Sequence, residues 1–459
     1  MNVRLTVAAS LSLLLVTSAA SAAQPWLEDR RYGEGIGLRA GRFEFHPGIS
    51  TEFGYDSNFF QRSDEHNSQI IDPAVANAWR LRVTPSVTLE TVTERHSERG
   101  AENPGSAPMV EVTANAFASY SELFGSEEVS KERNFDLGVG GKVNIARQRP
   151  FGADLYGDFV RNGEPSNLPG TDHTFDRGEV RGGAGVSWRP GGGLFEWRVG
   201  YEAAYSYFED NPYRVDQNTQ QSILTNGRWR ILPRSGFLYD ARYTFVRYTH
   251  ADAPQPNGDD LQARLGFSGL VTNRLAFLVM AGWNSTFYDH NKATAGQNYD
   301  GWVGQAELKY FVMPGPDSDS AQTGLSSIAV GYLRDATNSY LGTFYTRDRP
   351  YLSFDWFLGG VFVAQAQGGF SIYDFPASTP GNGAFTQDHV DASVFMEYRF
   401  SDTFALNGTF LYDRAIGKGP NTGAGQYGLL VGTNAAGQPL YDDLEYQRIQ
   451  AYLGLRLFW

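Results

Sequence analysis

Apolar and polar residues alternate along most of this chain. The last stretch, 449–459, shows the pattern clearly: Leu453 and Leu457 have one parity, and Gln450 and Arg456 have the other. Side chains of a β-strand point alternately to opposite faces, so a period of two predicts strands with one apolar and one mixed polar face. The chain is therefore expected to be all-β.

Eighteen segments carry this pattern. Most are long enough to supply the roughly 9–11 residues with which a tilted strand crosses a bilayer. One of them begins with the nearly all-apolar run 275–281, which alone is also compatible with a buried helix. Sixteen or twenty strands remain alternatives, because one misread hairpin changes the count by two. The segments are 43–55, 79–90, 109–120, 134–146, 151–161, 179–189, 195–208, 220–231, 237–248, 261–271, 275–288, 299–312, 325–334, 340–358, 361–373, 389–400, 403–412 and 444–459.

The connections alternate between short turns and longer loops rich in Gly, Asn, Asp and Pro. This asymmetry is typical of closed outer-membrane barrels, with turns on the periplasmic side and loops outside. Two connections in the turn series, 91–108 and 313–324, are longer than the rule predicts, and the last loop is long enough to fold into the lumen. The short turns are 147–150, 190–193, 232–235, 272–274, 359–360 and 401–402; the loops include 56–77, 121–133, 162–174, 289–298, 374–387 and 413–443.

Composition excludes several classes of protein. The mean hydropathy of −0.38, with no long apolar window after residue 23, excludes a bundle of transmembrane helices. It is compatible with a barrel, in which only alternate residues face lipid. The absence of Cys excludes disulfides, thiolate catalysis and Cys-ligated metals, and a net charge of −13 argues against nucleic acid as a partner.

The N-terminus has the features of a secretory signal. Arg4 supplies a basic start, residues 5–16 an apolar core, and Ala20 and Ala22 a small-residue cleavage site. We therefore expect a signal peptide over 1–22, a short periplasmic segment without periodicity over 23–42, and a barrel over 43–459.

Two stretches resemble known proteins. Residues 449–459, ending on Trp459, resemble the C-terminal signature strand of bacterial outer-membrane β-barrels. Residues 54–60 (GYDSNFF), after a strand containing Pro47, resemble a motif in a family of outer-membrane β-barrel porins, some of which accompany exopolysaccharide export. No N-terminal helical repeat domain of the kind found in some other exopolysaccharide porins is evident. The resemblance implies a single up-and-down barrel, integral to a Gram-negative outer membrane. It also implies as partners membrane lipid and lipopolysaccharide, the barrel assembly machinery (through the last strand) and a periplasmic polysaccharide export protein.

Parity assigns the side chains to two faces. Aromatic residues on the apolar face are expected to form lipid-facing girdles: Trp79, Trp188, Tyr201, Tyr205, Trp229, Trp283, Tyr310, Trp356, Phe404, Phe410 and Trp459. The other face is expected to line a water-filled, weakly selective lumen in which neither sign of charge dominates. The predicted pore-lining residues are Arg80, Arg82, Glu111, Arg181, Arg198, Glu202, Arg228, Arg230, Asp240, Arg242, Arg264, Glu307, Tyr345, Tyr351, Asp391, Glu397, Arg399, Tyr446, Arg448, Tyr452 and Arg456.

Inward tyrosines interspersed with charges suit carbohydrate. A ring face stacks on sugar C–H groups, while hydroxyl and charged groups form hydrogen bonds to sugar hydroxyls. The alternative is that these tyrosines fill space and support inward-folded loops. The set is Tyr156, Tyr248, Tyr345, Tyr351, Tyr373, Tyr446 and Tyr452.

No motif indicates an enzyme, a cofactor or a metal site. The seven His residues form no H-E-x-x-H pattern, and no nucleophile elbow or phosphate-binding loop stands out. The leading hypothesis is a passive outer-membrane conduit for an anionic or neutral polysaccharide. The alternatives are a general or sugar-selective diffusion porin, and a scaffold or adhesin that displays the loop 413–443.

Overall fold

A computed structural model gives the arrangement of the chain. It describes residues 37–459 except 65–73, 92–108, 148, 166–173, 191–192, 210, 254, 290–297, 314–325, 340–342, 359–360, 378–382, 418, 420, 424–425, 428 and 434–438. The expected signal peptide and most of the expected periplasmic segment lie outside the described residues.

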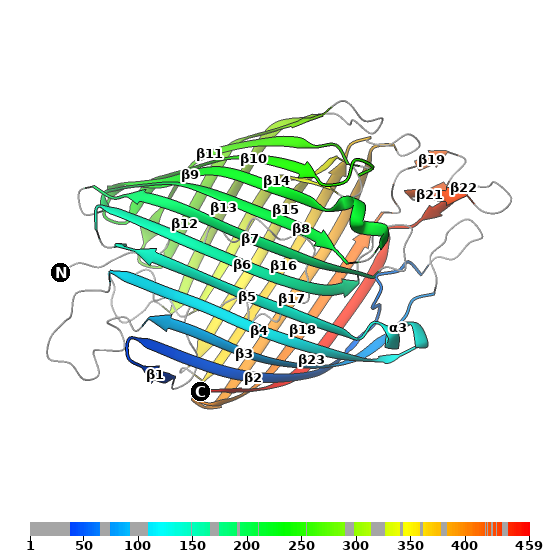
Figure 1. The fold of residues 1–459 in the computed structure, drawn as a ribbon, viewed down its shortest axis with the longest axis horizontal. Coiled ribbons are helices and arrows are strands. Elements are labelled where there is room, and N and C mark those ends of the chain that lie inside the picture. Colours follow the sequence, from blue (N-terminus) through cyan, green and yellow to red (C-terminus); the bar gives the residue numbers. More distant parts are fainter. Residues whose placement is uncertain are drawn as a thin grey trace.

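The chain forms one closed antiparallel barrel (Figure 1). Its sheet has nineteen strands, of which the three-residue β1 only extends one edge, so eighteen strands make the wall. Every strand pairs with its neighbour in the sequence, which is the up-and-down topology that the alternation and connection lengths predicted. The wall consists of β2 (Phe43–Asp56), β3 (Ala78–Thr91), β4 (Val110–Gly125), β5 (Asn134–Ile145), β6 (Phe151–Pro165), β7 (Thr174–Trp188), β8 (Phe195–Phe208), β9 (Asn218–Leu232), β10 (Ser235–Tyr248), β11 (Gly258–Thr272), β12 (Leu275–Tyr288), β13 (Tyr299–Met313), β14 (Ser326–Asn338), β15 (Phe344–Leu358), β16 (Phe362–Phe375), β17 (Phe385–Ser401), β18 (Phe404–Ile416) and β23 (Tyr446–Phe458).

The first and last wall strands close the barrel. β2 pairs with β23 from Gly48 opposite Phe458 to Asp56 opposite Gln450, and we call this pairing the seam. β1 (Leu38–Ala40) pairs with the start of β2 through a tight turn at Gly41, whose φ of +65° suits glycine. This strand was not expected from the sequence, because its three residues are too few to show a period.

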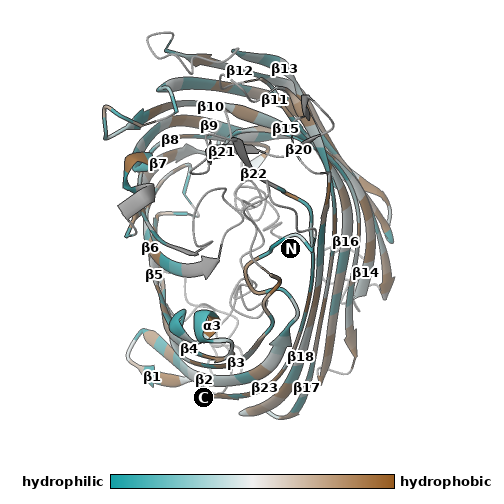
Figure 2. Cartoon of the chain, turned by 90° about the vertical axis from the view of Figure 1, so that its right-hand side faces the viewer, coloured by the Kyte–Doolittle hydropathy of each residue, from teal (hydrophilic) through white to brown (hydrophobic). Residues whose placement is uncertain are grey.

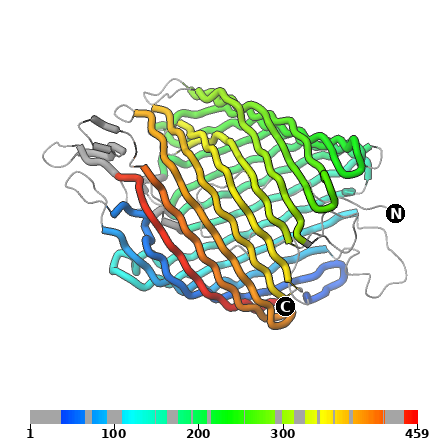
Figure 3. The backbone as a smooth tube through the Cα atoms, turned by 180° about the vertical axis from the view of Figure 1, so that it is seen from behind, coloured from blue at the N-terminus to red at the C-terminus, as the bar shows by residue number. Residues whose placement is uncertain are grey.

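The two ends of the barrel differ. At one end, which we call the turn end, short connections join β5 to β6, β9 to β10, β11 to β12 and β17 to β18, and Trp459 lies there too. The opposite loop end carries the longer connections. Figure 3 shows from behind how steeply the strands tilt between the two ends.

The wall is inside-out compared with a water-soluble protein, because its apolar side chains are exposed on the outside and most of its charged side chains face the interior. β23 alternates without exception: Leu453 is 70% exposed, whereas Arg456 is 2% exposed. Nine of the eleven aromatic residues expected on the outer face are among its exposed side chains, and Trp356 and Phe404 are partly exposed. Figure 2, which looks along the barrel, shows the wall closed around one interior.

Most expected strands agree with the structure to within a few residues, including the ambiguous run 275–281, which lies in β12. Seven boundaries differ by four or five residues. Four of these extend strands at the loop end: β6 ends at Pro165 rather than residue 161, β7 begins at Thr174 rather than 179, β17 begins at Phe385 rather than 389, and β18 ends at Ile416 rather than 412. β4 continues to Gly125 and leads into the short helix α3 (Glu127–Lys131), where a loop was expected. β14 continues to Asn338, because cross-strand pairing extends beyond the alternating residues. The next strand starts at Phe344 rather than residue 340, where its pairing with Asn338 begins.

Three of the expected loops contain short elements of secondary structure, and α3 is one of these elements. The 3-10 helix η2 (Asn211–Asp216) connects β8 to β9. The expected loop 413–443 contains two hairpins: β19 (Asn421–Gly423) with β20 (Gln426–Tyr427), and β21 (Leu429–Thr433) with β22 (Pro439–Asp442). No helix in the described part of the chain is long and apolar enough to cross a membrane.

Candidate functional site: the inner wall of the barrel

All of the predicted pore-lining residues share the inner face in the observed register. Neighbouring strands bring their charges together as cross-strand pairs, for example Arg82 with Glu52 and Arg264 with Asp240, both within hydrogen-bond distance. Their exposure is very uneven around the barrel, however, and this unevenness divides the wall into two regions.

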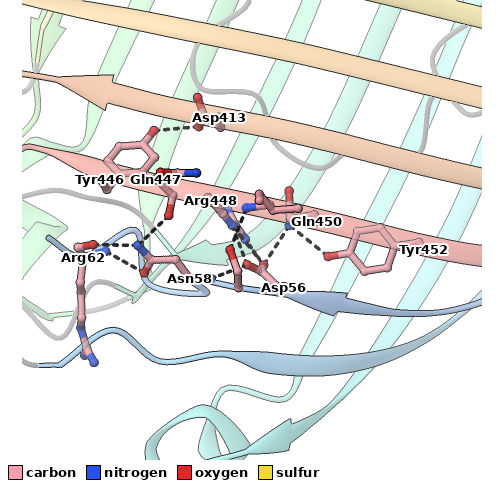
Figure 4. Close-up of polar contacts among 11 residues, drawn as sticks. Asp56, Asn58, Arg62, Asp413, Tyr446, Gln447, Arg448, Gln450 and Tyr452 are labelled. Carbon is pink, nitrogen blue, oxygen red and sulfur yellow. Dashed lines mark hydrogen bonds and ion pairs between the residues drawn. The ribbon is translucent and has the colours of Figure 1, made fainter. Parts of the chain in front are cut away.

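The first region is the seam, where a buried ion pair joins the first and last strands (Figure 4). The guanidinium of Arg448 donates to both carboxylate oxygens of Asp56 at 2.5–3.0 Å. Gln450 donates to the same carboxylate at 2.9 Å and to the hydroxyl of Tyr452 at 3.0 Å. Asp56 is 1% exposed and Arg448 5%. A buried charge is tolerated only when it is paired and hydrogen-bonded, as both of these are.

The segment after β2 folds back onto this pair. The amide of Asn58 donates to the carbonyl oxygens of Arg62 and of Gln447 in β23, and its own oxygen accepts from the Arg62 N–H at 2.9 Å. Arg62, almost fully buried, pairs with Glu128 of α3. Phe59 and Phe60 pack in a small apolar cluster with Ala78, Leu123 and Val129.

These contacts explain the stretch 54–60 that resembled a porin motif. A Cβ on Gly54 would lie 2.1 Å from the Ala451 carbonyl oxygen and 2.2 Å from the Tyr452 ring, so only glycine fits. Tyr452 in turn carries the guanidinium of Arg80 over its ring, 4.6 Å from the centroid. In this structure the stretch closes the seam.

Much of the inner face on either side of the seam is also enclosed, although Arg399 and Asp391 of β17 are 32% and 28% exposed. Glu397 of β17 is 1% exposed and binds both Arg456 and Arg399, the latter at 2.8 Å. Glu52 and Thr84 are 2% and 0% exposed. We call the inner faces of β17, β18, β23, β2 and β3 the seam wall; its charges hold strands together.

The second region, the inner faces of β5 to β9, is more open, and we call it the open wall. Its side chains are also paired, Arg181 with Asp158 at 3.3 Å and Arg198 with Asp154 at 2.6 Å, but they are 13–32% exposed. At its edge, Arg242 of β10 is 41% exposed and holds Glu202 at 3.1 Å. Partly exposed pairs of this kind remain available to a ligand.

Two inward tyrosines lie flat against the wall. Tyr156 donates to Glu202 at 2.5 Å and covers Gly183, where a Cβ would lie 2.4 Å from its ring. Tyr351 donates to Glu307 at 2.6 Å and covers Gly331 in the same way. An aromatic ring over a glycine protects the backbone beneath it and leaves its second face toward the interior.

The other inward tyrosines differ among themselves. Tyr345 and Tyr373 contact each other edge to face and are partly exposed. Tyr446 and Tyr452 are 7% and 4% exposed, and so they are covered rather than presented to the interior. Tyr446 donates to Asp413 at 2.8 Å, and Asp413 also binds His389 at 2.7 Å.

Ion pairs on the outer face near the loop end were not foreseen. Arg161, Arg247 and Arg334 lie there on β6, β10 and β14, and bind Asp176, Asp259 and Asp348 on the following strand. Arg161 also binds Glu209 just beyond β8, and this hydrogen bond lowers the pKa of the Glu209 carboxyl. The sequence did contain a signal for these pairs. Each arginine lies near the end of a strand, at a position where the alternation predicts an apolar residue.

The described residues contain no group of three His, Asp or Glu side chains arranged to hold a metal ion. The wall offers ion pairs, hydroxyls and ring faces, which suit reversible contact with a hydrated solute. These groups are spread over many strands and do not converge on one reacting atom.

No protein family and no curated protein sequence matches this chain. Solved structures with a similar fold include FpvA of Pseudomonas aeruginosa bound to pyoverdine, at 10% identity and a TM-score of 0.44, covering 91% of this chain and 72% of that chain. The outer-membrane protein OpdK of P. aeruginosa gives 9% identity and a TM-score of 0.44, covering 90% and 99%. OccAB3 of Acinetobacter baumannii gives 10% identity and a TM-score of 0.40, covering 90% and 99%. At this degree of likeness, any function has to be argued from this chain's own residues.

Proposed function

We propose that this protein is an outer-membrane pore through which a polysaccharide crosses the membrane. The observation that carries the proposal is the inside-out wall: apolar and aromatic side chains cover the outside of a closed barrel, and charged side chains cover its inside. Lipid tolerates that outer face, and closure satisfies the backbone groups of every strand. The turn end then faces the periplasm and the loop end the outside.

The inner face of the barrel has the chemistry of a weak carbohydrate track, on the open wall at Tyr156 and on β15 at Tyr351. Tyr156 and Tyr351 each present a ring face that can stack on sugar C–H groups, next to the carboxylates of Glu202 and Glu307. Many weak sites in series suit transport, because a conducted molecule must bind well enough to enter and loosely enough to leave.

The membrane and its assembly machinery are the expected partners. Trp229 and Trp283, 57% and 52% exposed on the outer face, suit the headgroup level. The outer ion pairs near the loop end lie where lipopolysaccharide headgroups would be. The exposed apolar parity of β23 is the feature that a barrel assembly factor would bind, and a periplasmic export protein would dock at the turn end.

The test is single-channel recording of the refolded protein in planar bilayers, with neutral glucan oligomers added to one side. We expect large steady openings that the oligomers block transiently. Replacing both flat rings (Tyr156→Ala with Tyr351→Ala) should shorten the blocks several-fold, because each stacking contact contributes about 1 kcal/mol. Tyr201→Ala removes an outer-face tyrosine and is the matched control. Blocks unchanged in the double variant would contradict the carbohydrate track.

A general diffusion porin is the second candidate, favoured by the pairing of opposite charges along the wall. Arg198 with Asp154 and Arg242 with Glu202 cancel each other's charge locally, which is expected of a weakly selective channel. In the same recording, this candidate predicts openings that are indifferent to glycans. A barrel that conducts no ions would instead favour a scaffold or adhesin.

A further inference from the structure

Basic side chains gather on the open wall toward the turn end. We call this group the basic patch; it lies on β5, β8, β9 and the turns beside them, and consists of Lys142, Arg147, Arg189, Arg198, Arg228 and Arg230. The acidic side chains among them are Glu111, Asp154 and Glu196, half as many as the basic ones. This local excess stands out in a chain whose acidic residues outnumber its basic ones by 51 to 38.

The contacts of the patch show that its acids are shared. Glu196 binds Arg189 at 2.8 Å and Arg228 at 3.5 Å. Arg189 also donates to the backbone carbonyl of Arg147, which brings the two turns together. Arg147 reaches Glu111 at 3.5 Å and remains 43% exposed. One carboxylate for two guanidinium groups leaves hydrogen-bond donors without an acceptor.

Three basic side chains in the patch have hydrogen-bond donors for which the described residues supply no acceptor. Within the described part of the chain, the Nε of Arg228 is buried and makes no hydrogen bond. Lys142 is exposed, and the described residues supply it no side-chain hydrogen bond or ion pair. The same holds for the side chain of Arg230, which follows Arg228 on the same face of β9. Arg228 and Arg230 are partly buried, and an unsatisfied cation in such a position is costly unless a ligand supplies the missing acceptor.

We propose that the basic patch is the site where an anionic, carboxylate-bearing polysaccharide first binds at the turn end of the barrel. The proposal rests on the polysaccharide pore proposed above and adds the charge of the cargo and the mouth at which it enters. Guanidinium groups bind carboxylates in a bidentate manner, and the short cross-strand distances allow several carboxylates of one polymer to be held together.

The other part of the turn end strengthens this assignment. On the inner face of β2 and β3 the side chains near the turn end are Glu44, His46 and Glu90, with His46 3.9–4.0 Å from the two carboxylates. The turn-end mouth is therefore basic along β5, β8 and β9 and acidic along β2 and β3. An anionic chain is attracted to the first and repelled from the second, which directs it along the open wall.

The experiment measures block of single channels by oligogalacturonate, a carboxylate-bearing glycan, applied separately from each side. Since the chain has no Cys, a single Asp402→Cys in the β17–β18 turn reports orientation through a membrane-impermeant thiol reagent. We expect half-block at a lower concentration from the turn end than from the loop end. Raising the salt from 0.1 M to 1 M should weaken the block, because the Debye length falls from about 10 Å to about 3 Å.

Two variants locate the effect. Arg228→Gln with Arg230→Gln should raise the half-blocking concentration from the turn end about tenfold, the loss expected for charge-assisted hydrogen bonds. Arg264→Gln, on the inner face of β11 and outside both the patch and the carbohydrate track, is the control and should change it little. Neutral glucan block should be the same in all three proteins.

Equal block from both sides, or a double variant that behaves like the control, would overturn the basic patch as a polysaccharide site. In that case block by neutral glucan would persist, and the proposed pore would stand. If no channel opened, or if no glycan of either kind blocked it, the proposed function itself would fail, and the inference about the patch with it.

Discussion

The seam wall and the open wall are built from the same residue types, yet they use them differently. On the seam wall Glu397 and Arg456 are 1% and 2% exposed and hold each other. On the open wall the Arg181 and Glu179 side chains lie 3.8 Å apart and are 32% and 24% exposed. The first pair is part of the structure of the barrel, and the second remains accessible from the interior.

The difference teaches that an inward charge is not by itself a pore-lining charge. A barrel has to be closed once, where its first strand meets its last, and here the closure is reinforced by buried ion pairs. Strands far from the seam are joined to their neighbours in the sequence through short turns or loops. The inward ion pairs of β5 to β9 are the more accessible ones, whereas Arg264 on β11 and Arg347 on β15 are again buried, each 7% exposed.

The largest expected effect comes from breaking a seam-wall pair. Glu397→Ala leaves Arg456 buried without its carboxylate, and removing one partner of a buried pair costs about 3–5 kcal/mol. Glu179→Ala on the open wall is the matched control and should cost at most about 1 kcal/mol. The measurement is the free energy of unfolding in urea with the protein in lipid vesicles. Similar losses in the two variants would mean that the two walls do not differ in this way.

A smaller effect is expected from crowding the seam. Gly54→Ala pushes a Cβ against the Ala451 carbonyl and the Tyr452 ring, and such overpacking typically costs about 1–3 kcal/mol. Gly408→Ala, in the neighbouring strand β18, meets its nearest atom at an ordinary 3.5 Å and should be nearly neutral. The same urea titration compares them. Equal stability of the two variants would show that the seam tolerates the added methyl group.

Much of the fold could be predicted from the sequence, because a strand with one apolar face has apolar and polar residues that alternate along its sequence. The eighteen strands, the turns and the outer face follow from that parity. Elements without a period could not be found this way: β1 is too short, and α3 is a single helical turn. The end of β14 was missed because backbone pairing continues after the alternation stops.

The candidate site was only partly predictable. Parity placed Tyr351 and Tyr452 on the same face, but only the three-dimensional packing shows that Tyr452 is covered, while Tyr351 is partly exposed. The basic patch was missed for the same reason. Its members come from separate turns and strands, and Arg228 looks like any other inward arginine until its hydrogen-bond partners are known.

The most direct test of the difference between the two walls is the accessibility of single cysteines. The chain has no native Cys, so Glu179→Cys on the open wall and Ser50→Cys on the seam wall can each be probed with a charged thiol reagent in lipid vesicles. Ser50 is 1% exposed. We predict that the cysteine at position 179 reacts rapidly in the folded barrel, and that the one at position 50 reacts only after unfolding. Equal rates at the two positions in the folded protein would contradict the division of the inner wall into a structural and an accessible region.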